Sequence, residues 1–114
     1  MHPPLRGRFY WTRLPDEPDE TVRPALVVSG NVRNRLANDV MLVPASSQIR
    51  LAPTHVVLEP GMGGLRERSV LKCEHLVTVS KSRLVEGPLG AALPPETMRA
   101  VVAGLLRALD VPIA

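Results

Sequence analysis

The sequence predicts a mainly β protein of the α+β class, in which a small barrel or sandwich is followed by a C-terminal helix. Short apolar runs recur between turn-forming segments, as is typical of small barrels and sandwiches. The last part of the chain instead places apolar residues at helical spacing. Because 114 residues suffice for one hydrophobic core but not for two, we expect a single domain over residues 1–114.

The N-terminal segment is expected to form a strand and then an acidic loop. Residues 6–14 alternate loosely and contain the three aromatic residues of the chain, which favours a strand. Residues 15–20 hold two prolines and four carboxylates, so they cannot continue that strand. We expect an exposed loop directly before Arg23, which either closes over a ligand or is simply a solvated turn.

The middle of the chain reads as several strands. Residues 25–29 are continuously apolar and rich in β-branched side chains, which indicates a strand buried on both faces. Gly30 and Asn31 then turn the chain. The other expected elements are strands over residues 39–44, 55–59 and 70–79, a glycine-rich connection over 60–64 and a short helical turn over 80–84.

The C-terminal helix is the clearest element. Pro94 and Pro95 suit a helix start, where a missing amide hydrogen costs nothing. An apolar stripe follows at spacings of three and four, formed by Met98, Val101, Val102, Leu105, Leu106 and Leu109. We expect this stripe to dock on the sheet of the same chain, the alternative being a face for a partner. Gly104 lowers helix stability by roughly 1 kcal/mol relative to alanine and would permit close packing.

Charge and composition leave nucleic acid as an allowed partner without requiring it. The formal net charge is +3, from 14 basic and 11 acidic residues. Arginines concentrate at residues 6–8, at 33–35 and at Arg50. Each is either a contact to phosphate or a solvated surface residue.

The sequence also bears on the compartment. Cys73 has no second cysteine to pair with and lies in an apolar stretch, so we expect a small buried residue and a reducing environment. Residues 1–6 lack the apolar run of a signal peptide, and no stretch approaches the roughly 18 apolar residues of a membrane span. The expectation is a cytoplasmic protein without membrane association.

Two strand ends carry side chains suited to phosphate. Arg23 offers a permanently charged planar fork that matches a phosphodiester. Ser46 offers a hydroxyl that both donates and accepts a hydrogen bond. Together they suggest a ribonuclease, in which arginine stabilises a phosphorane but is a poor general base because its pKa exceeds about 12. For Ser46 and Ser47 the alternative is a turn that caps local backbone amides.

Ordered landmarks along the chain resemble the MazF/PemK family, the toxin endoribonucleases of bacterial toxin–antitoxin pairs. These are Arg6-Gly7, Arg23-Pro24 with the apolar run 26–29, residues 31–34, 44–48, 53–55 and 69–70, and the helix after Pro94. The resemblance implies an SH3-like β-barrel with short helices, a homodimer, and sequence-specific cleavage of single-stranded RNA to 2′,3′-cyclic phosphate and 5′-hydroxyl ends without metal or cofactor. It also implies a cognate antitoxin, whose acidic disordered tail would fold over the cleft.

The resemblance places catalysis on Arg23 and Ser46. Ser46 stands where the family usually carries threonine, so the hydroxyl is kept but the methyl group that restrains its rotamer is lost. Some members place a carboxylate five residues before the arginine, where this chain has Pro18. Glu17 or Glu20 would then be the candidate general base.

Substrate binding is expected to fall to polar loop residues, because single-stranded RNA is read on exposed base edges. The candidates are Asn31, Asn34, Ser47, Gln48, Arg50 and His55. His55 begins a strand, where contact with RNA is plausible. His75 lies within the strand expected over 70–79, so we assign it a structural role.

Two other functions stay open on the sequence alone. One is a non-catalytic toxin of the same shape, which would bind a protein such as DNA gyrase, or a decayed relative that only binds RNA or antitoxin. The other is a small barrel with an unrelated structural role. In each of these, Arg23 and Ser46 would be expendable.

Overall fold

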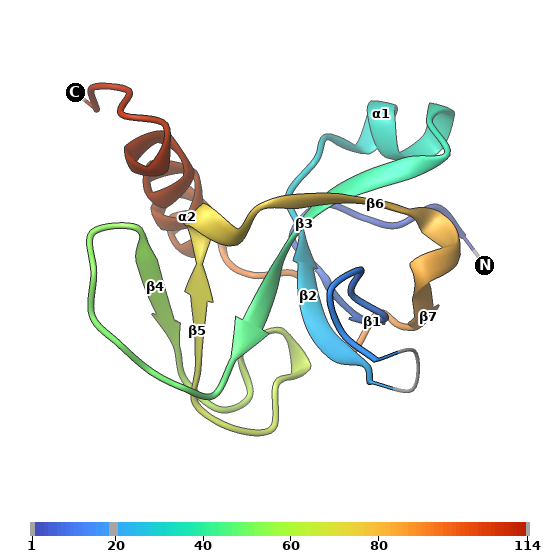
Figure 1. Ribbon diagram of the computed structural model, residues 1–114, viewed down its shortest axis with the longest axis horizontal. Helices are drawn as coiled ribbons and strands as arrows, with labels where there is room; N and C mark the ends of the chain where they lie inside the picture. The colour runs from blue at the N-terminus through green and yellow to red at the C-terminus, as the bar shows by residue number, and fades with distance from the viewer. Residues whose placement is uncertain (1, 19–20, 114) are drawn as a thin grey trace.

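Antiparallel strands form one seven-stranded sheet that curls into a half-barrel (Figure 1). The structure is a computed structural model that describes residues 2–18 and 21–113. In sheet order the strands are β4 (His55–Leu58), β5 (Ser69–Lys72), β3 (Asp39–Ser46), β2 (Arg23–Val27), β1 (Phe9–Thr12) and β7 (Leu84–Glu86), while β6 (Val77–Ser80) pairs with β3. The helical elements are α1 (Asn31–Leu36), α2 (Pro95–Ala108) and the 3-10 turns η1 (Met62–Gly64), η2 (Cys73–His75) and η3 (Lys81–Arg83). This confirms the predicted mainly β, α+β class with short helices and a C-terminal helix.

The strand β3 is the longest and organises the sheet. One edge pairs with β2, from Val27 opposite Leu42 to Ala25 opposite Pro44. The other edge pairs first with β6 and then, at its C-terminal end, with β5. The two halves of the sheet therefore meet along β3.

The long strand expected over 70–79 is wrong in its middle. Residues 73–75 form η2, which separates β5 from β6. On β3 three steps lead from Leu42 to Ala45, whereas their partners Val77 and Leu71 are six residues apart. The helical turn η2 contains the extra residues, and both strands therefore pair with the same edge of β3. The apolar residues on either side hid this break from the sequence pattern.

The curled sheet buries side chains on both faces. In β2, Leu26 belongs to the cluster under α2, while Ala25 and Val27 belong to a second cluster on the other face. All three are fully buried, which confirms the prediction of a strand covered on both sides. Successive side chains of a strand point to opposite faces, and this period places the site residues described below.

The helix α2 docks on the sheet of its own chain, as predicted. Val101 is buried, and Met98 and Leu105 pack against the same core cluster. Gly104 faces η2, where an added Cβ would lie 2.7 Å from Cys73 Sγ. The glycine therefore permits the close approach, and Cys73 is buried as expected. Leu109, at the C-cap of α2, is exposed.

Besides the 3-10 turns η1 and η2, the sequence prediction lacked the elements α1 and β7. The helix α1 occupies residues 31–36, where a turn was expected. The strand β7 has three residues, too few for a visible alternation. The predicted helical turn over 80–84 is present as η3, and the strands over 39–44 and 55–59 are present as β3 and β4.

Candidate active site

Two cavities open on either side of one wall at the ends of β2 and β3. Their volumes are about 470 and 590 Å³. The residues that line both are Arg23, Ala45, Ser46 and Ser47. In Figure 1 the start of β2 and the end of β3 lie at the same end of the sheet, beyond the stretch in which the two strands pair. We call these two cavities together the groove.

Strand geometry brings Arg23 and Ser46 together. The pairing of β2 with β3 ends at Ala25 opposite Pro44, and Arg23 and Ser46 each lie two residues beyond that pair, where both line the two cavities. The period of two also places both side chains on one face of the sheet. The structure thus brings to one groove the two strand ends that the sequence singled out, while their catalytic roles remain predictions.

The Arg23 guanidinium is held at one edge. Its side chain is 46% exposed, and Nε donates a hydrogen bond to Glu17 Oε1 at 2.5 Å. Within residues 2–18 and 21–113 the Arg23 side chain makes this one hydrogen bond, and its Nη groups donate none there. The other candidate base, Glu20, lies outside the described residues.

Ser46 makes the local cap that was the alternative to a catalytic role. Its Oγ accepts a hydrogen bond from Gln48 N at 3.1 Å. The hydroxyl hydrogen is not used by this bond, so Ser46 can still donate to a phosphate oxygen. Ser47 is exposed and lines both cavities, while Gln48 lines the larger one. These three residues are thus available to a ligand in the groove.

Of the two asparagines of α1 that were predicted to bind substrate, Asn34 is excluded by its burial, while Asn31 is exposed but lines neither cavity. Asn34 is fully buried, its Nδ2 donates to Ser29 O at 2.9 Å, and its Oδ1 accepts from Ser29 Oγ. Asn31 Oδ1 accepts from Arg6 N at 2.7 Å, and α1 lies before the opposite end of β3 from Ser46. Both side chains therefore stabilise the local fold instead of lining the groove.

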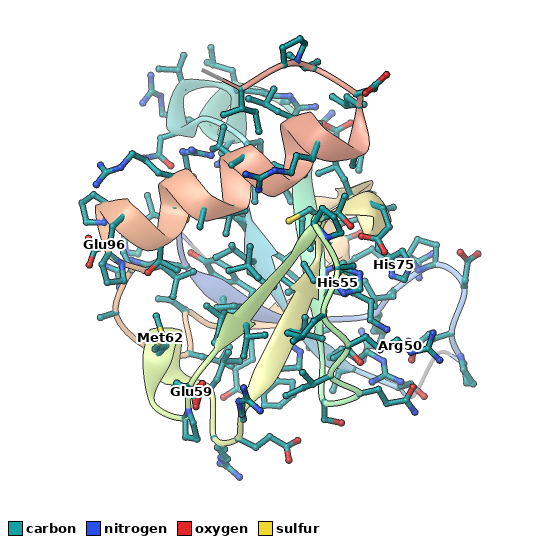
Figure 2. The ribbon with its side chains drawn as sticks, turned by 90° about the vertical axis from the view of Figure 1, so that its left-hand side faces the viewer. Arg50, His55, Glu59, Met62, His75 and Glu96 are labelled. Atoms are coloured by element: carbon teal, nitrogen blue, oxygen red, sulfur yellow. The ribbon has the colours of Figure 1, made fainter. Side chains whose placement is uncertain are left out.

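His55 is also engaged inside the protein and lines neither cavity. Its Nε2 is 2.9 Å from Glu74 Oε2, and its Nδ1 is 3.1 Å from the Arg50 carbonyl oxygen. Thr54 Oγ1 donates to Glu74 Oε1 at 2.7 Å. The His55 side chain is only 7% exposed. Figure 2 labels Arg50 and His55 on the side of the molecule where α2 crosses β4 and β5.

The same contacts shift two pKa values. The hydrogen bond to Glu74 and the one to the Arg50 carbonyl raise the pKa of His55. For Glu74, burial acts toward a higher pKa, but the hydrogen bonds from His55 and Thr54 outweigh it and lower the pKa to about 2. The network ties the loop before β4 to η2. The Arg50 side chain, which was predicted to bind substrate, is exposed and lies outside both cavities.

Sequence reasoning missed groove residues that come from other elements. His75 is exposed in η2 and lines the larger cavity with Lys72. This corrects the strand position predicted for His75, because the residue lies in the helical turn η2. Trp11 lines the smaller cavity. In the sequence, the turn η2 is signalled by the polar residues Lys72, Glu74 and His75, which interrupt the apolar run over 70–79.

The described residues were also searched for metal ligands and membrane spans. Within 2–18 and 21–113, no three His, Cys, Asp or Glu side chains gather as they would around a metal ion. In the same ranges no helix has the length and apolar character needed to cross a membrane.

Comparison with known proteins finds relatives that are named endoribonucleases. Endoribonuclease MazF1 of Mycobacterium bovis is 31% identical over 114 residues, covering 98% of each protein. Endoribonuclease EndoA of Bacillus subtilis is 33% identical over 67 residues, 57% of this chain and 58% of that protein. The solved structure of a mycobacterial endoribonuclease in complex with its cognate antitoxin is 32% identical, with a TM-score of 0.80 over 97% of this chain and 99% of that one.

Structures of MazF with MazE from Deinococcus radiodurans share the fold at 23% identity, with a TM-score of 0.78 over 98% of this chain. Residues 5–109 match the family described as the PemK-like, MazF-like toxin of type II toxin-antitoxin systems. The chain belongs to this family.

Proposed function

We propose that this chain is the toxin of a type II toxin–antitoxin system and a metal-independent, sequence-specific endoribonuclease that cleaves single-stranded RNA. The observation that carries the proposal is the shared wall of the groove, because Arg23 and Ser46 both line the two cavities that meet there. Relatives at 31% and 32% identity that match nearly the whole chain are named endoribonucleases. These names favour cleavage over the non-catalytic alternatives.

The reaction is an in-line transfer within the RNA. The 2′-oxygen attacks the phosphorus as the 2′-hydroxyl loses its proton, and the bond to the 5′-oxygen breaks as that oxygen gains one. The products are a 2′,3′-cyclic phosphate and a 5′-hydroxyl. Arg23 stabilises the charge on the five-coordinate phosphorane, a role in which one lost donor costs on the order of 3 kcal/mol. Ser46 donates its hydroxyl hydrogen to a phosphate oxygen and so helps to orient the phosphodiester.

The rest of the groove binds the flanking nucleotides. Ser47 and Gln48 line it and offer donors and acceptors to base edges. Arg50, exposed in the same loop, contacts the RNA backbone beyond the groove. The three expected contacts from Asn31, Asn34 and His55 are not part of this proposal.

The proposal includes the setting of the enzyme. Residues 1–114 act as one domain, and two copies form a homodimer in the cytoplasm, where the RNA substrate is found. The partner is a cognate antitoxin, as in the mycobacterial complex. An acidic antitoxin segment that folds over the groove would meet Arg23 and Lys72 there.

Incubation of the purified protein with RNA in the presence of a chelator tests the proposal. We expect cleavage to survive chelation, to leave 2′,3′-cyclic phosphate ends, and to slow by about a hundredfold or more in Arg23→Ala. Intact RNA across a library of varied sequences, from a protein shown to be folded, would overturn the proposal.

A further inference from the structure

In the acidic loop before β2, the carboxylate of Glu17 contacts Arg23, which lines both cavities of the groove. Glu17 Oε1 accepts the hydrogen of Arg23 Nε at 2.5 Å, and both residues line the larger cavity. The Glu17 side chain is 25% exposed, less than the 46% of Arg23. The pair is therefore part of the groove wall, and the carboxylate is the more enclosed of the two groups.

The backbone around Glu17 is restrained. Pro15 and Pro18 flank it, and proline fixes one backbone dihedral angle. Glu17 N donates to Leu14 O at 3.2 Å, and Thr21 N donates to Pro18 O at 2.8 Å. Leu14 is itself buried in the second core cluster. A turn anchored to the core thus carries the carboxylate to Arg23.

We propose that Glu17 is a positioning residue for Arg23, an inference that rests on the function proposed above. A guanidinium has five N–H donors in a rigid plane, one on Nε and two on each Nη. With Nε bound to Glu17, rotation of that plane is restricted. The two Nη groups then form the remaining fork, which matches two oxygens of a phosphate. Glu17 acts through Arg23 and does not contact the RNA.

This role differs from that of a general base, and the amide variant separates the two. Glu17→Gln keeps an oxygen that accepts from Nε but cannot take up a proton from a 2′-hydroxyl. Glu17→Ala removes the acceptor altogether. Asp16→Asn is the matched control, because Asp16 precedes Glu17 in the same loop, lines the same cavity and carries the same charge.

The experiment measures kcat and KM for RNA cleavage by the full chain and these three variants. Because small misplacements of a catalytic group cost up to about a hundredfold, we expect Glu17→Ala to lower kcat about tenfold or more, and Glu17→Gln and Asp16→Asn to stay within about threefold of the parent. KM should change little in Glu17→Ala, or fall, since a negative charge leaves the groove. The loop is at the surface, so thermal melting should show all three variants folded.

A second measurement follows the pair without relying on turnover. In ¹H–¹⁵N spectra, the Nε hydrogen of Arg23 should exchange slowly with water in the parent protein and in Glu17→Gln, but rapidly in Glu17→Ala. The Arg23→Ala spectrum assigns the resonance.

The outcomes separate this inference from the proposed function. Full activity in Glu17→Ala beside inactivity in Arg23→Ala would overturn the positioning role and leave the ribonuclease intact. Equal losses of activity in Glu17→Gln and Glu17→Ala would overturn the positioning role in favour of a general base. An equal loss in Asp16→Asn would also overturn it, because the effect would then come from the negative charge of the loop and not from the contact with Arg23. If the parent protein cleaves no RNA, the proposed function fails and this inference fails with it.

Discussion

The groove and the His55–Glu74 network contain similar kinds of side chain, but they use them differently. Around His55 both ring nitrogens and both carboxylate oxygens of Glu74 are engaged within the protein. In the groove, within the described residues, Arg23 donates from Nε only, and Ser46 accepts a hydrogen bond while its own hydroxyl hydrogen stays available. Donors that remain free beside a cavity distinguish a candidate site from a structural network, and residue type alone does not. Each prediction below tests one side of this contrast.

Loss of Arg23 should have the largest effect. Its side chain is 46% exposed and lies outside the core, so Arg23→Ala should leave the melting temperature nearly unchanged. Cleavage should slow by about a hundredfold to a thousandfold, the usual cost of a lost donor to developing charge. Steady-state cleavage of a fluorescent RNA checks this, with Arg35→Ala on α1 as the control. Equal losses in both variants would point to nonspecific electrostatics.

Asn34 should show the opposite behaviour. Asn34→Ala leaves the Ser29 carbonyl without its partner and removes one of the hydrogen bonds of the Ser29 hydroxyl, which should lower the free energy of unfolding by about 1–3 kcal/mol. The kcat of the folded fraction should be unchanged. Urea unfolding and cleavage assays measure the two effects, and exposed Asn31→Ala serves as the comparison. A stable but inactive Asn34→Ala would reinstate its role in substrate binding.

Ser46 should contribute less than Arg23, because a neutral hydrogen bond is weaker than one from a cation. Ser46→Ala should slow cleavage about tenfold, equivalent to the upper range of one net hydrogen bond. Ser47→Ala is the natural control, since that residue lines the same two cavities. A larger loss in Ser47→Ala than in Ser46→Ala would transfer the phosphate contact to Ser47.

The His55–Glu74 network should give a small effect on stability that depends on pH. The raised pKa of His55 adds stability that is complete below 6.5 and is lost as pH rises through the native value. The lowered pKa of Glu74 adds stability present above 4.5 and lost as pH falls toward about 2. The pair therefore stabilises the fold most between pH 4.5 and pH 6.5.

His55→Ala should reduce this contribution. The pH-dependent part should be about 1 kcal/mol or less, because Glu74 is 40% exposed and solvent screens the pair. Urea midpoints of both proteins at about pH 5.5 and about pH 9 test it. The difference between parent and variant should be larger at the lower pH, and a larger difference at the higher pH would contradict the assignment.

Much of the fold could be predicted because local patterns dictated it. The apolar run over 25–29 and the stripe on α2 each specify one way to bury side chains. The convergence of Arg23 and Ser46 was predictable since both end neighbouring strands. What the sequence could not reveal was the use of polar groups by the tertiary structure. Asn34 carries the same amide whether it is buried or exposed.

The break at η2 shows the same limit for backbone structure. Residues 73–75 contain neither glycine nor proline, and the apolar residues around them suit a strand. The bend arises because β5 and β6 must both pair with β3, a contact between distant parts of the chain. It exposes His75, which is why that residue was misassigned.

The central claim is that Arg23 and Ser46 act on one phosphodiester in the groove. A double-mutant cycle on cleavage tests it most directly, using Arg23→Ala, Ser46→Ala and the combined variant. Groups that act as a unit give strongly non-additive losses. The account predicts that the combined variant is scarcely slower than Arg23→Ala. Losses that multiply in full would place the two side chains on separate parts of the reaction and contradict the account.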